Sequence, residues 1–289
     1  MSNDLPPGAE EGYRFRRILM ALDPSSEDLS TVEATAALAR GLRAELLSLF
    51  VEDIDLIRLA QHPEFSAFST LSAGPQPFAA DNLRRALRRQ LTRSRHAVEQ
   101  AAAHQRIKSV FQVRQGRPVA EIVSASGTVD LVVIGWGRRD TPATLAFSRA
   151  ATVRAIVEAA SRPVLLLRPG AAGGGPVMVA YGGTEVDRRA LKAAAEIAQH
   201  DGGIVEIAMP ATPADRADQW RRDISAALAN AHLTVRFLAM PRGTLEDLCA
   251  AATHRGVSLL VLGGDSNVLT GGAALRAFER AGCSLLLVR

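Results

Sequence analysis

The sequence predicts an α/β protein made of two tandem units, each a doubly wound parallel sheet with helices on both faces. Residues 130–137 and 258–264 are short apolar runs that end in glycine, the pattern of a strand buried on both faces of a parallel sheet. Stretches with helical spacing separate such runs throughout the chain, and this alternation indicates parallel strands joined by helical crossovers. A chain of 289 residues is long enough for two units with a core each.

The first unit is expected at residues 17–168, after a polar N-terminal tail at 1–16. Its apolar runs predict strands at 17–22, 45–51, 109–114, 130–135 and 163–167. Helical periodicity and capping residues predict helices that end near Arg40 and cover about 81–104, 119–126 and 144–161. The unit therefore begins as a βαβ motif, whose crossover is expected to be right-handed.

Residues 52–82 interrupt this alternation. The segment starts with a short expected helix near 56–60 and then holds three prolines and three phenylalanines. Connections of this length inside a compact domain are usually functional or disordered, and the phenylalanines argue against disorder. The segment is interpreted as a packed surface excursion, with a lid or a partner-binding arm as the alternative.

The helix expected at 81–104 carries a concentrated positive charge. An apolar stripe of leucine, valine and alanine runs along it at helical spacing, and six arginines lie mostly off that stripe. These are Arg84, Arg85, Arg88, Arg89, Arg93 and Arg95. Such a run is typical of a solvated helix face, and an anionic partner is the alternative interpretation.

The second unit is expected at residues 176–289, after a glycine-rich linker at 169–175. It repeats the element order of the first unit but has no counterpart of the 52–82 insertion. Its strands are predicted at 176–181, 203–209, 233–239, 258–263 and 284–288. Its helices are predicted up to about His200 and at about 213–231, 244–255 and 272–281.

Composition favours a globular protein of the cytoplasm. Apolar residues make up 47% of the chain, yet no apolar run approaches the roughly 18 residues that span a bilayer. The polar N-terminus lacks the apolar segment of a signal peptide. Two cysteines provide no disulfide framework, which fits a reducing compartment.

Charge and motifs argue against several functions. The net charge of +4 comes almost wholly from arginine, but aromatic residues are only 4% of the chain and no known base-reading signature is present, so a nucleic-acid partner is disfavoured. There is no Walker A loop, no GxSxG and no HExxH, and the six histidines lack ligand spacing. Neither an enzyme nor a metal site is therefore expected.

Four motifs stand in an order that resembles the universal stress protein family. They are ILMALDPSS (18–26), a Gly-x-Pro turn (116–118) ahead of a helix and DLVVIG (130–135), the glycine turn itself, and SRPVLLL (161–167). The chain is similar to a tandem member of that family from Arg17 to Arg289. The resemblance implies two five-stranded sheets of order 3-2-1-4-5 and an adenine-nucleotide site at the carboxyl ends of the strands. It also implies dimerisation through the last strand.

The ATP-binding members of this family are similar to one another in a phosphate-binding pattern, Gly-x-x-Gly, nine residues, then Gly-Ser or Gly-Thr. Its glycines let backbone N–H groups approach phosphates. The candidate nucleotide-binding residues of the first unit are Asp23, Val51, Gly135, Gly137, Arg138 and Ser148. Arg138 stands where the pattern has its second glycine, and its charge could replace a lost N–H group. Two registers stay open, because registering on Gly137 puts Ser148 at the hydroxyl position whereas counting back from Pro163 puts Ala150 and Ala151 there.

The second unit departs further from the family pattern. Gly182 takes the position of Asp23, Thr184 is a lone hydroxyl, and Asp265 follows the strand's glycines, where its charge would repel phosphate.

The sequence therefore predicts a non-enzymatic stress-response adaptor or regulator with a degenerate nucleotide site and no required cofactor. The alternative is a sensor that binds ATP, ADP or AMP through the first unit. A homodimer or an intramolecular pseudo-dimer of the units is expected, with no membrane contact and an unknown protein partner open.

Overall fold

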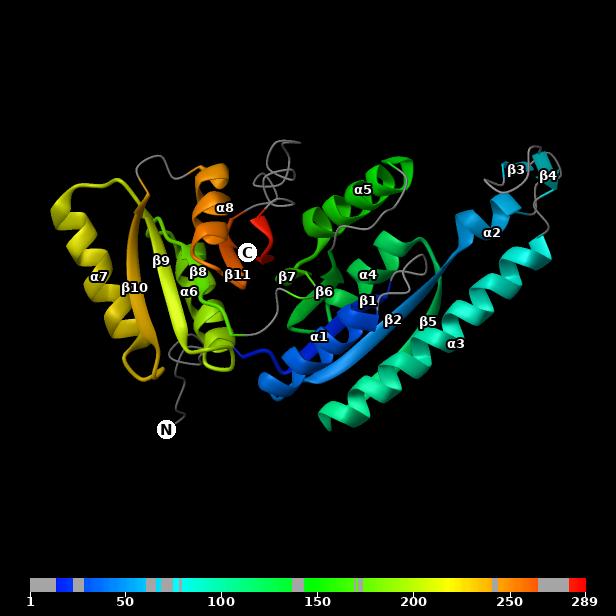
Figure 1. Ribbon diagram of the computed structural model, residues 1–289, viewed down its shortest axis with the longest axis horizontal. Helices are drawn as coiled ribbons and strands as arrows, with labels where there is room; N and C mark the ends of the chain where they lie inside the picture. Colours follow the sequence, from blue (N-terminus) through cyan, green and yellow to red (C-terminus); the bar gives the residue numbers. More distant parts are fainter. Residues whose placement is uncertain are drawn as a thin grey trace, which may run out of the picture. The chain divides into compact units, whose positions relative to one another are not determined.

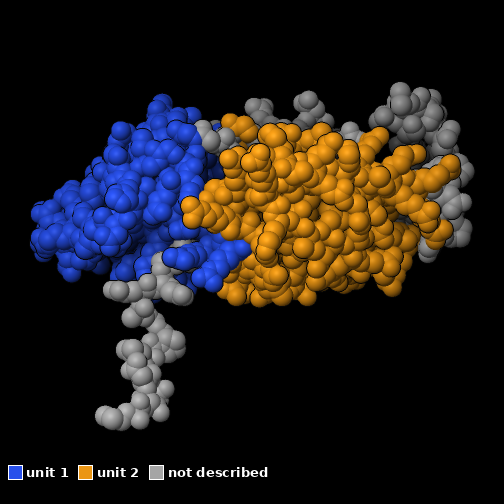
Figure 2. All heavy atoms as spheres, turned by 90° about the horizontal axis from the view of Figure 1, so that it is seen from below, with its two compact units in different colours: residues 1–16, 171–289 blue, residues 17–170 orange. Residues whose placement is uncertain are grey.

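The computed structural model of the chain describes residues 14–22, 29–60, 66–68, 75–77, 80–136, 143–168, 170, 174–240, 244–264 and 281–289. The chain divides into two compact units (Figure 2). The first unit is Arg17–Gly170, and the second is Ala171–Arg289 together with Met1–Arg16. Phe15, next to the first strand, is only 1% exposed.

The sheet of the first unit is wholly parallel and has the strand order β5-β2-β1-β6-β7 (Figure 1). Its strands are β1 (Arg17–Leu22), β2 (Glu45–Asp53), β5 (Ser109–Gly116), β6 (Leu131–Gly135) and β7 (Val164–Leu167). The middle of β1, residues 18–20, and residues 131–134 of β6 are apolar and buried, as both faces of a parallel sheet require. Numbered along the chain, this order is 3-2-1-4-5, as the sequence predicts.

Helices cover both faces of this sheet. They are α1 (Leu29–Gly41), α2 (Ile54–Ala60), α3 (Ala80–Gln105), α4 (Pro118–Ser126) and α5 (Ala143–Ala159). Helix α1 packs against α3, and α4 packs against α5. Apolar residues of α1 at helical spacing, Val32, Ala36 and Ala39, are buried and hold the helix to its neighbours.

The insertion after β2 contains more regular structure than its sequence indicates. Helix α2 continues directly from β2, and the short strands β3 (Ser66–Phe68) and β4 (Pro75–Pro77) pair antiparallel in a separate sheet. The sequence analysis predicts no strands here. Three-residue strands are too short to show the alternation that identifies a strand in a sequence, and β4 also begins and ends with proline.

The second unit repeats the topology in the order β10-β9-β8-β11-β12, again wholly parallel. Its strands are β8 (Val177–Ala180), β9 (Ile204–Pro210), β10 (Thr234–Met240), β11 (Leu259–Gly263) and β12 (Ser284–Val288). Its helices are α6 (Glu185–Ala198), α7 (Ala214–Leu228) and α8 (Leu245–His254). The helix predicted at 272–281 lies outside the residues described, except for its last residue. The chain passes from β9 to α7 in three residues, so this unit has no counterpart of the insertion.

The predicted fold class is therefore confirmed for both units, and apart from β3 and β4 the differences lie at element ends. Strand β2 runs two residues beyond the predicted end and β5 also runs two residues longer, because their pairing continues to Asp53 and Gly116. These last residues are polar or glycine, so the apolar run that predicts the strand stops before the backbone pairing does. Among the residues described, no helix has the length and apolar character needed to cross a membrane.

Candidate functional site

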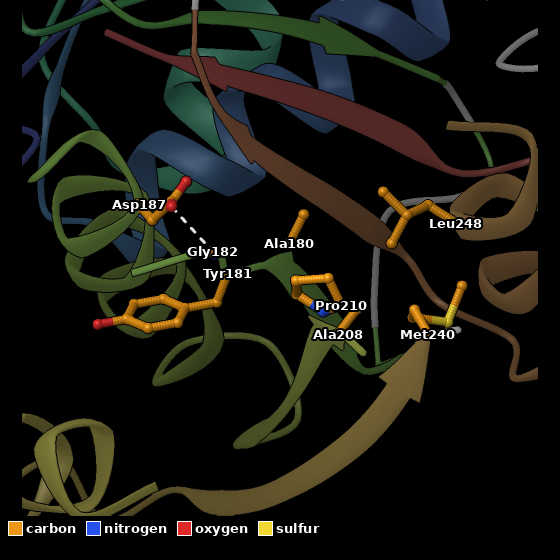
Figure 3. A pocket seen from close by; sticks show the side chains of 8 residues that line it. All are labelled: Ala180, Tyr181, Gly182, Asp187, Ala208, Pro210, Met240 and Leu248. Atoms are coloured by element: carbon orange, nitrogen blue, oxygen red, sulfur yellow. Dashed lines mark hydrogen bonds between the residues drawn. The ribbon is translucent and has the colours of Figure 1, made fainter. Parts of the chain in front are cut away.

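In the second unit, the carboxyl ends of three neighbouring strands, β8, β9 and β10, border a pocket of about 210 Å³ (Figure 3). Ligands of open α/β sheets bind beyond the carboxyl ends of the strands. The winding of this sheet changes direction next to the pocket, between β8 and β11. The pocket is lined by Ala180, Tyr181, Gly182, Asp187, Ala208, Pro210, Met240 and Leu248. Most of these side chains are apolar, and Asp187 is the charged member.

Asp187 lies in the first turn of α6 and closes the turn that follows β8. Its Oδ2 accepts hydrogen bonds of 3.0 Å from the backbone N–H groups of Gly182 and Thr184. The N–H of Asp187 in turn donates to Oγ1 of Thr184 at 3.1 Å, which completes a capping box. The Asp187 residue is only 8% exposed, so its carboxylate is held inside the turn rather than in solvent.

This arrangement changes the electrostatics of the helix N-terminus. The N–H groups at the start of a helix form a natural anion site, and the helix dipole adds positive potential there. In the second unit an internal carboxylate already occupies that position. A phosphate that approached the same N–H groups would meet a buried negative charge and would have to displace it.

The glycine that ends the fourth strand of each unit has a packing role. A Cβ placed on Gly263 would lie 2.9 Å from Oδ1 of Asp187 and 3.0 Å from the backbone of Val186. A Cβ placed on Gly135 would lie 2.9 Å from Cγ2 and 3.0 Å from Oγ1 of Thr31. Thr31 and Asp187 are each the third residue of the first helix of their unit, so the two positions correspond. Glycine is needed at both strand ends because the helix approaches so closely.

Aromatic packing fills the space beside the β8 turn. Gly183 has a φ of +84°, and a Cβ there would lie 2.5 Å from Nε1 of Trp220. Tyr181 and Trp220 meet edge to face with ring centroids 5.9 Å apart. Burial raises the pKa of the Tyr181 hydroxyl above its ordinary value, against the opposing effect of the nearby Arg188. The turn is thus packed tightly on this side, and its shape depends on a glycine in the left-handed region.

The residues predicted for the first unit's site are only partly described. Val51 and Gly135 lie on the two strands that flank β1, near its carboxyl end, but the Val51 side chain is 2% exposed and packs in the core. Asp23, Gly137 and Arg138 lie outside the described residues. Ser148 falls within α5, but its side chain is not described.

Sequence reasoning missed Asp187 and misread its neighbour. Thr184 was interpreted as a lone hydroxyl, whereas it is the N-cap of α6 and bonds to the residue three positions later. A Thr-x-x-Asp spacing ahead of an apolar helix is a capping signal, so the pattern TEVD could have identified both residues. Asp265, which was predicted to repel phosphate, lies outside the described residues.

A buried ion pair stands apart from the pocket lining in the same unit. The Glu206 side chain on β9 is 2% exposed and accepts from Nε of Arg255 and, at 2.8 Å, from Nη2 of Arg255. Nη1 of Arg236 on β10 lies 3.8 Å from Glu206. Hydrogen bonding to Glu206 raises the pKa of Arg255, as expected for a cation held by a buried carboxylate. This cluster is interpreted as structural.

Comparison with known proteins agrees with this architecture. The model of the universal stress protein family matches residues 14–168, which is more than half of the chain. The chain therefore belongs to the universal stress protein family. Residues 169–289 lie outside the matched range.

Several solved structures share the fold of both units. A universal stress protein from Archaeoglobus fulgidus is 15% identical with a TM-score of 0.67, over 95% of this chain and 96% of that one. The cytoplasmic domain of a prokaryotic cation chloride cotransporter is 13% identical with a TM-score of 0.57, over 95% of each chain. A putative universal stress protein from Pseudomonas aeruginosa is 14% identical with a TM-score of 0.53, over 94% of this chain and 92% of that one. At such identities these likenesses show the fold alone. A search of curated proteins found no match.

Proposed function

We propose that this chain is a non-enzymatic stress-response adaptor or regulator whose second unit has lost its nucleotide site. The observation that supports the proposal is that the Asp187 carboxylate accepts hydrogen bonds from the backbone N–H groups of Gly182 and Thr184. These are donors at the strand edge and helix N-terminus where an anionic ligand would bind. A unit that fills its own anion site with a side chain gains a rigid turn and gives up phosphate binding.

The energetics favour the internal carboxylate over a phosphate. Displacing Asp187 would leave a buried carboxylate without its hydrogen bonds, next to an added negative charge. Like charges that share a poorly solvated site repel strongly. A nucleotide would therefore have to overcome both the lost hydrogen bonds and the repulsion before making any contact of its own.

The lining of the pocket also supports a non-enzymatic role. Its titratable side chains are Tyr181 and Asp187, and the Asp187 carboxylate is committed to the turn. General acid–base catalysis needs a group that can exchange a proton with a substrate within hydrogen-bond reach. We place the protein in the cytoplasm, because Cys249 and Cys283 are buried and not joined in a disulfide, as expected in a reducing compartment.

A second candidate function is adenine-nucleotide sensing by the first unit. One observation favours it: the neutral side chain of Thr31 packs on Gly135 at the position where Asp187 packs on Gly263. The first unit thus lacks at this position the carboxylate that opposes phosphate in the second unit. Asp23 and the Arg138 charge are the residues through which such a site would act.

The deciding experiment is calorimetric titration of the full chain with Mg-ATP, ADP and AMP, combined with native mass spectrometry. The adaptor proposal expects no bound nucleotide in either unit, whereas sensing expects one per chain, lost in Asp23→Ala. Asp215→Ala, at an exposed position early in α7, is the control for a general loss of negative charge. Two nucleotides per chain, or one that persists in Asp23→Ala, would contradict the loss of the second site. The native mass also distinguishes a homodimer from a chain whose two units suffice.

A further inference from the structure

The long helix α3 presents a continuous face of positive charge that no part of the proposed function uses. Six arginines lie between residues 84 and 95, and all six side chains are exposed. Their number exceeds the formal charge of +4 on the whole chain. The carboxylates in the sequence of α3 are Asp81 and Glu99, which flank this stretch without interrupting it.

The opposite face of α3 holds the helix to its unit. Leu87 and Leu91 are half-buried, and Val98 and Ala101 are buried. The helix packs against α1 and against strands β2 and β5 of the sheet (Figure 1). The apolar side is therefore occupied, and the arginine side is left toward solvent. An amphipathic helix that lies in a membrane surface needs its apolar face free for lipid, so this helix is not of that kind.

The arginines form two rows with a third position between them. Helical spacing places Arg84, Arg88 and Arg95 along one flank of the helix. Arg89 and Arg93 lie on the opposite flank, and Arg85 lies between the two rows. A helix with its side chains is roughly 10–12 Å across. The major groove of duplex DNA is about 12 Å wide, with a phosphate strand on either side. Two arginine rows on opposite flanks of one helix therefore match two phosphate strands across a groove.

The same spacing carries a cost for the isolated helix. Arg84 and Arg88, and Arg85 and Arg89, are like charges one turn apart, an arrangement that destabilises a helix. An anionic partner would convert this repulsion into attraction. Arginine is also the side chain best suited to phosphate, because its planar fork can donate two parallel hydrogen bonds.

We propose that the arginine face of α3, residues 84–95, docks duplex nucleic acid through the phosphate backbone, without reading its sequence. Residues 84–95 contain no aromatic side chain, and the Arg95 guanidinium already lies over the Phe111 ring of β5, 4.9 Å from its centroid, which favours a duplex over a single strand whose bases must stack. The lack of a base-reading signature in the sequence fits the same mode, since phosphate contacts alone confer no sequence preference.

The test uses a fluorescent duplex of mixed sequence. Its binding to the full chain is measured by fluorescence anisotropy at salt concentrations from about 50 mM to about 200 mM. Wild-type protein should bind with a dissociation constant on the order of 10⁻⁶ M at the lowest salt and weaken steeply as salt rises. The triple variant Arg85→Gln, Arg88→Gln, Arg89→Gln should bind at least ~10-fold more weakly, and its salt slope should fall by about 3.

A matched control removes the same charge elsewhere. Arg162, Arg189 and Arg222 are exposed arginines outside α3, and their triple change to glutamine should leave the salt slope within about 1 of wild type. Equal losses in the two triple variants would overturn the proposal, as would no binding by wild type at the lowest salt. Tighter binding to poly-glutamate or to anionic lipid vesicles than to the duplex would also overturn it. Circular dichroism of each variant confirms that the helix content is unchanged.

Discussion

The carboxylate of Asp187 and the backbone N–H of Gly182 are joined by a hydrogen bond of 3.0 Å across the turn between β8 and α6. The same oxygen also accepts from Thr184, so one side chain satisfies two donors at the helix N-terminus. In the first unit the corresponding helix position holds Thr31, a neutral residue. The two units thus share a fold but differ in the charge placed at the edge of the sheet where this fold binds ligands.

Asp187→Ala should destabilise the second unit. The change removes the Asp187 half of the capping box of α6 and leaves two poorly solvated N–H groups without their partner, which costs about 2 kcal/mol of unfolding free energy. Chemical denaturation followed by tryptophan fluorescence measures the loss, since Trp220 packs against this turn. Asp215→Ala is the matched control and should change the unfolding free energy by less than about 0.5 kcal/mol. An unchanged midpoint in Asp187→Ala would contradict the structural role of the carboxylate.

The extent to which the sequence predicts this protein differs between the core and the site. The buried strands are identified because runs such as 131–135 must be apolar on both faces, and that requirement is visible in the residues themselves. The β3–β4 hairpin is not identified, because strands of three residues are too short to show the alternation of apolar and polar residues that indicates a strand. The family pattern does not predict the role of Asp187, because that pattern compares only the positions that bind a ligand. It cannot show that the Asp187 carboxylate, five residues after Gly182, accepts a hydrogen bond from the Gly182 backbone.

The pair Glu206 and Arg255 should show strong coupling in a double-mutant cycle. Arg255→Leu leaves a carboxylate that is 2% exposed, with Arg236, at 3.8 Å, as its remaining charged partner among the residues described. Because Arg255 itself is partly exposed, the expected cost is about 2 kcal/mol rather than the larger values found for fully buried pairs. The double variant Glu206→Leu, Arg255→Leu should cost less than the sum of the two single changes.

The control for that cycle is an exposed ion pair of the same unit. Arg221 and Asp218 are 2.7 Å apart on the surface of α7, and Arg221→Leu should cost less than about 1 kcal/mol. Additive effects of Glu206→Leu and Arg255→Leu would contradict the proposed coupling.

The stability of the second unit should fall at high pH through Tyr181. Burial raises the pKa of this hydroxyl above 10.0, so the folded chain keeps its proton where the unfolded chain loses it. The contribution is fully present below the unfolded pKa and is lost as pH rises from about 10 through the folded pKa. Thermal melting between about pH 9 and pH 11 should show a smaller decline in Tyr181→Phe than in wild type. An equal decline in Tyr181→Phe and in wild type would contradict this role of Tyr181.

Gly135→Ala should destabilise the first unit because of Thr31 rather than because of any ligand. A Cβ at Gly135 would lie 2.9 Å from Cγ2 of Thr31, closer than atoms of this kind approach, and the strain should cost about 1–3 kcal/mol. Gly127→Ala is the control, since a Cβ there would lie 3.7 Å from its nearest neighbour, the Ser124 carbonyl oxygen. Urea denaturation of both variants measures the difference.

A Thr31→Ala background distinguishes a packing role of Gly135 from a ligand-binding role. Thr31→Ala removes the two atoms that would lie within 3.0 Å of a Cβ at Gly135, so Gly135→Ala should cost less in the Thr31→Ala background than in wild type. The packing explanation fails if the two changes are additive. If packing holds and the double variant also keeps the nucleotide affinity of wild type, Gly135 serves the approach of α1 to β6 and not the approach of a phosphate.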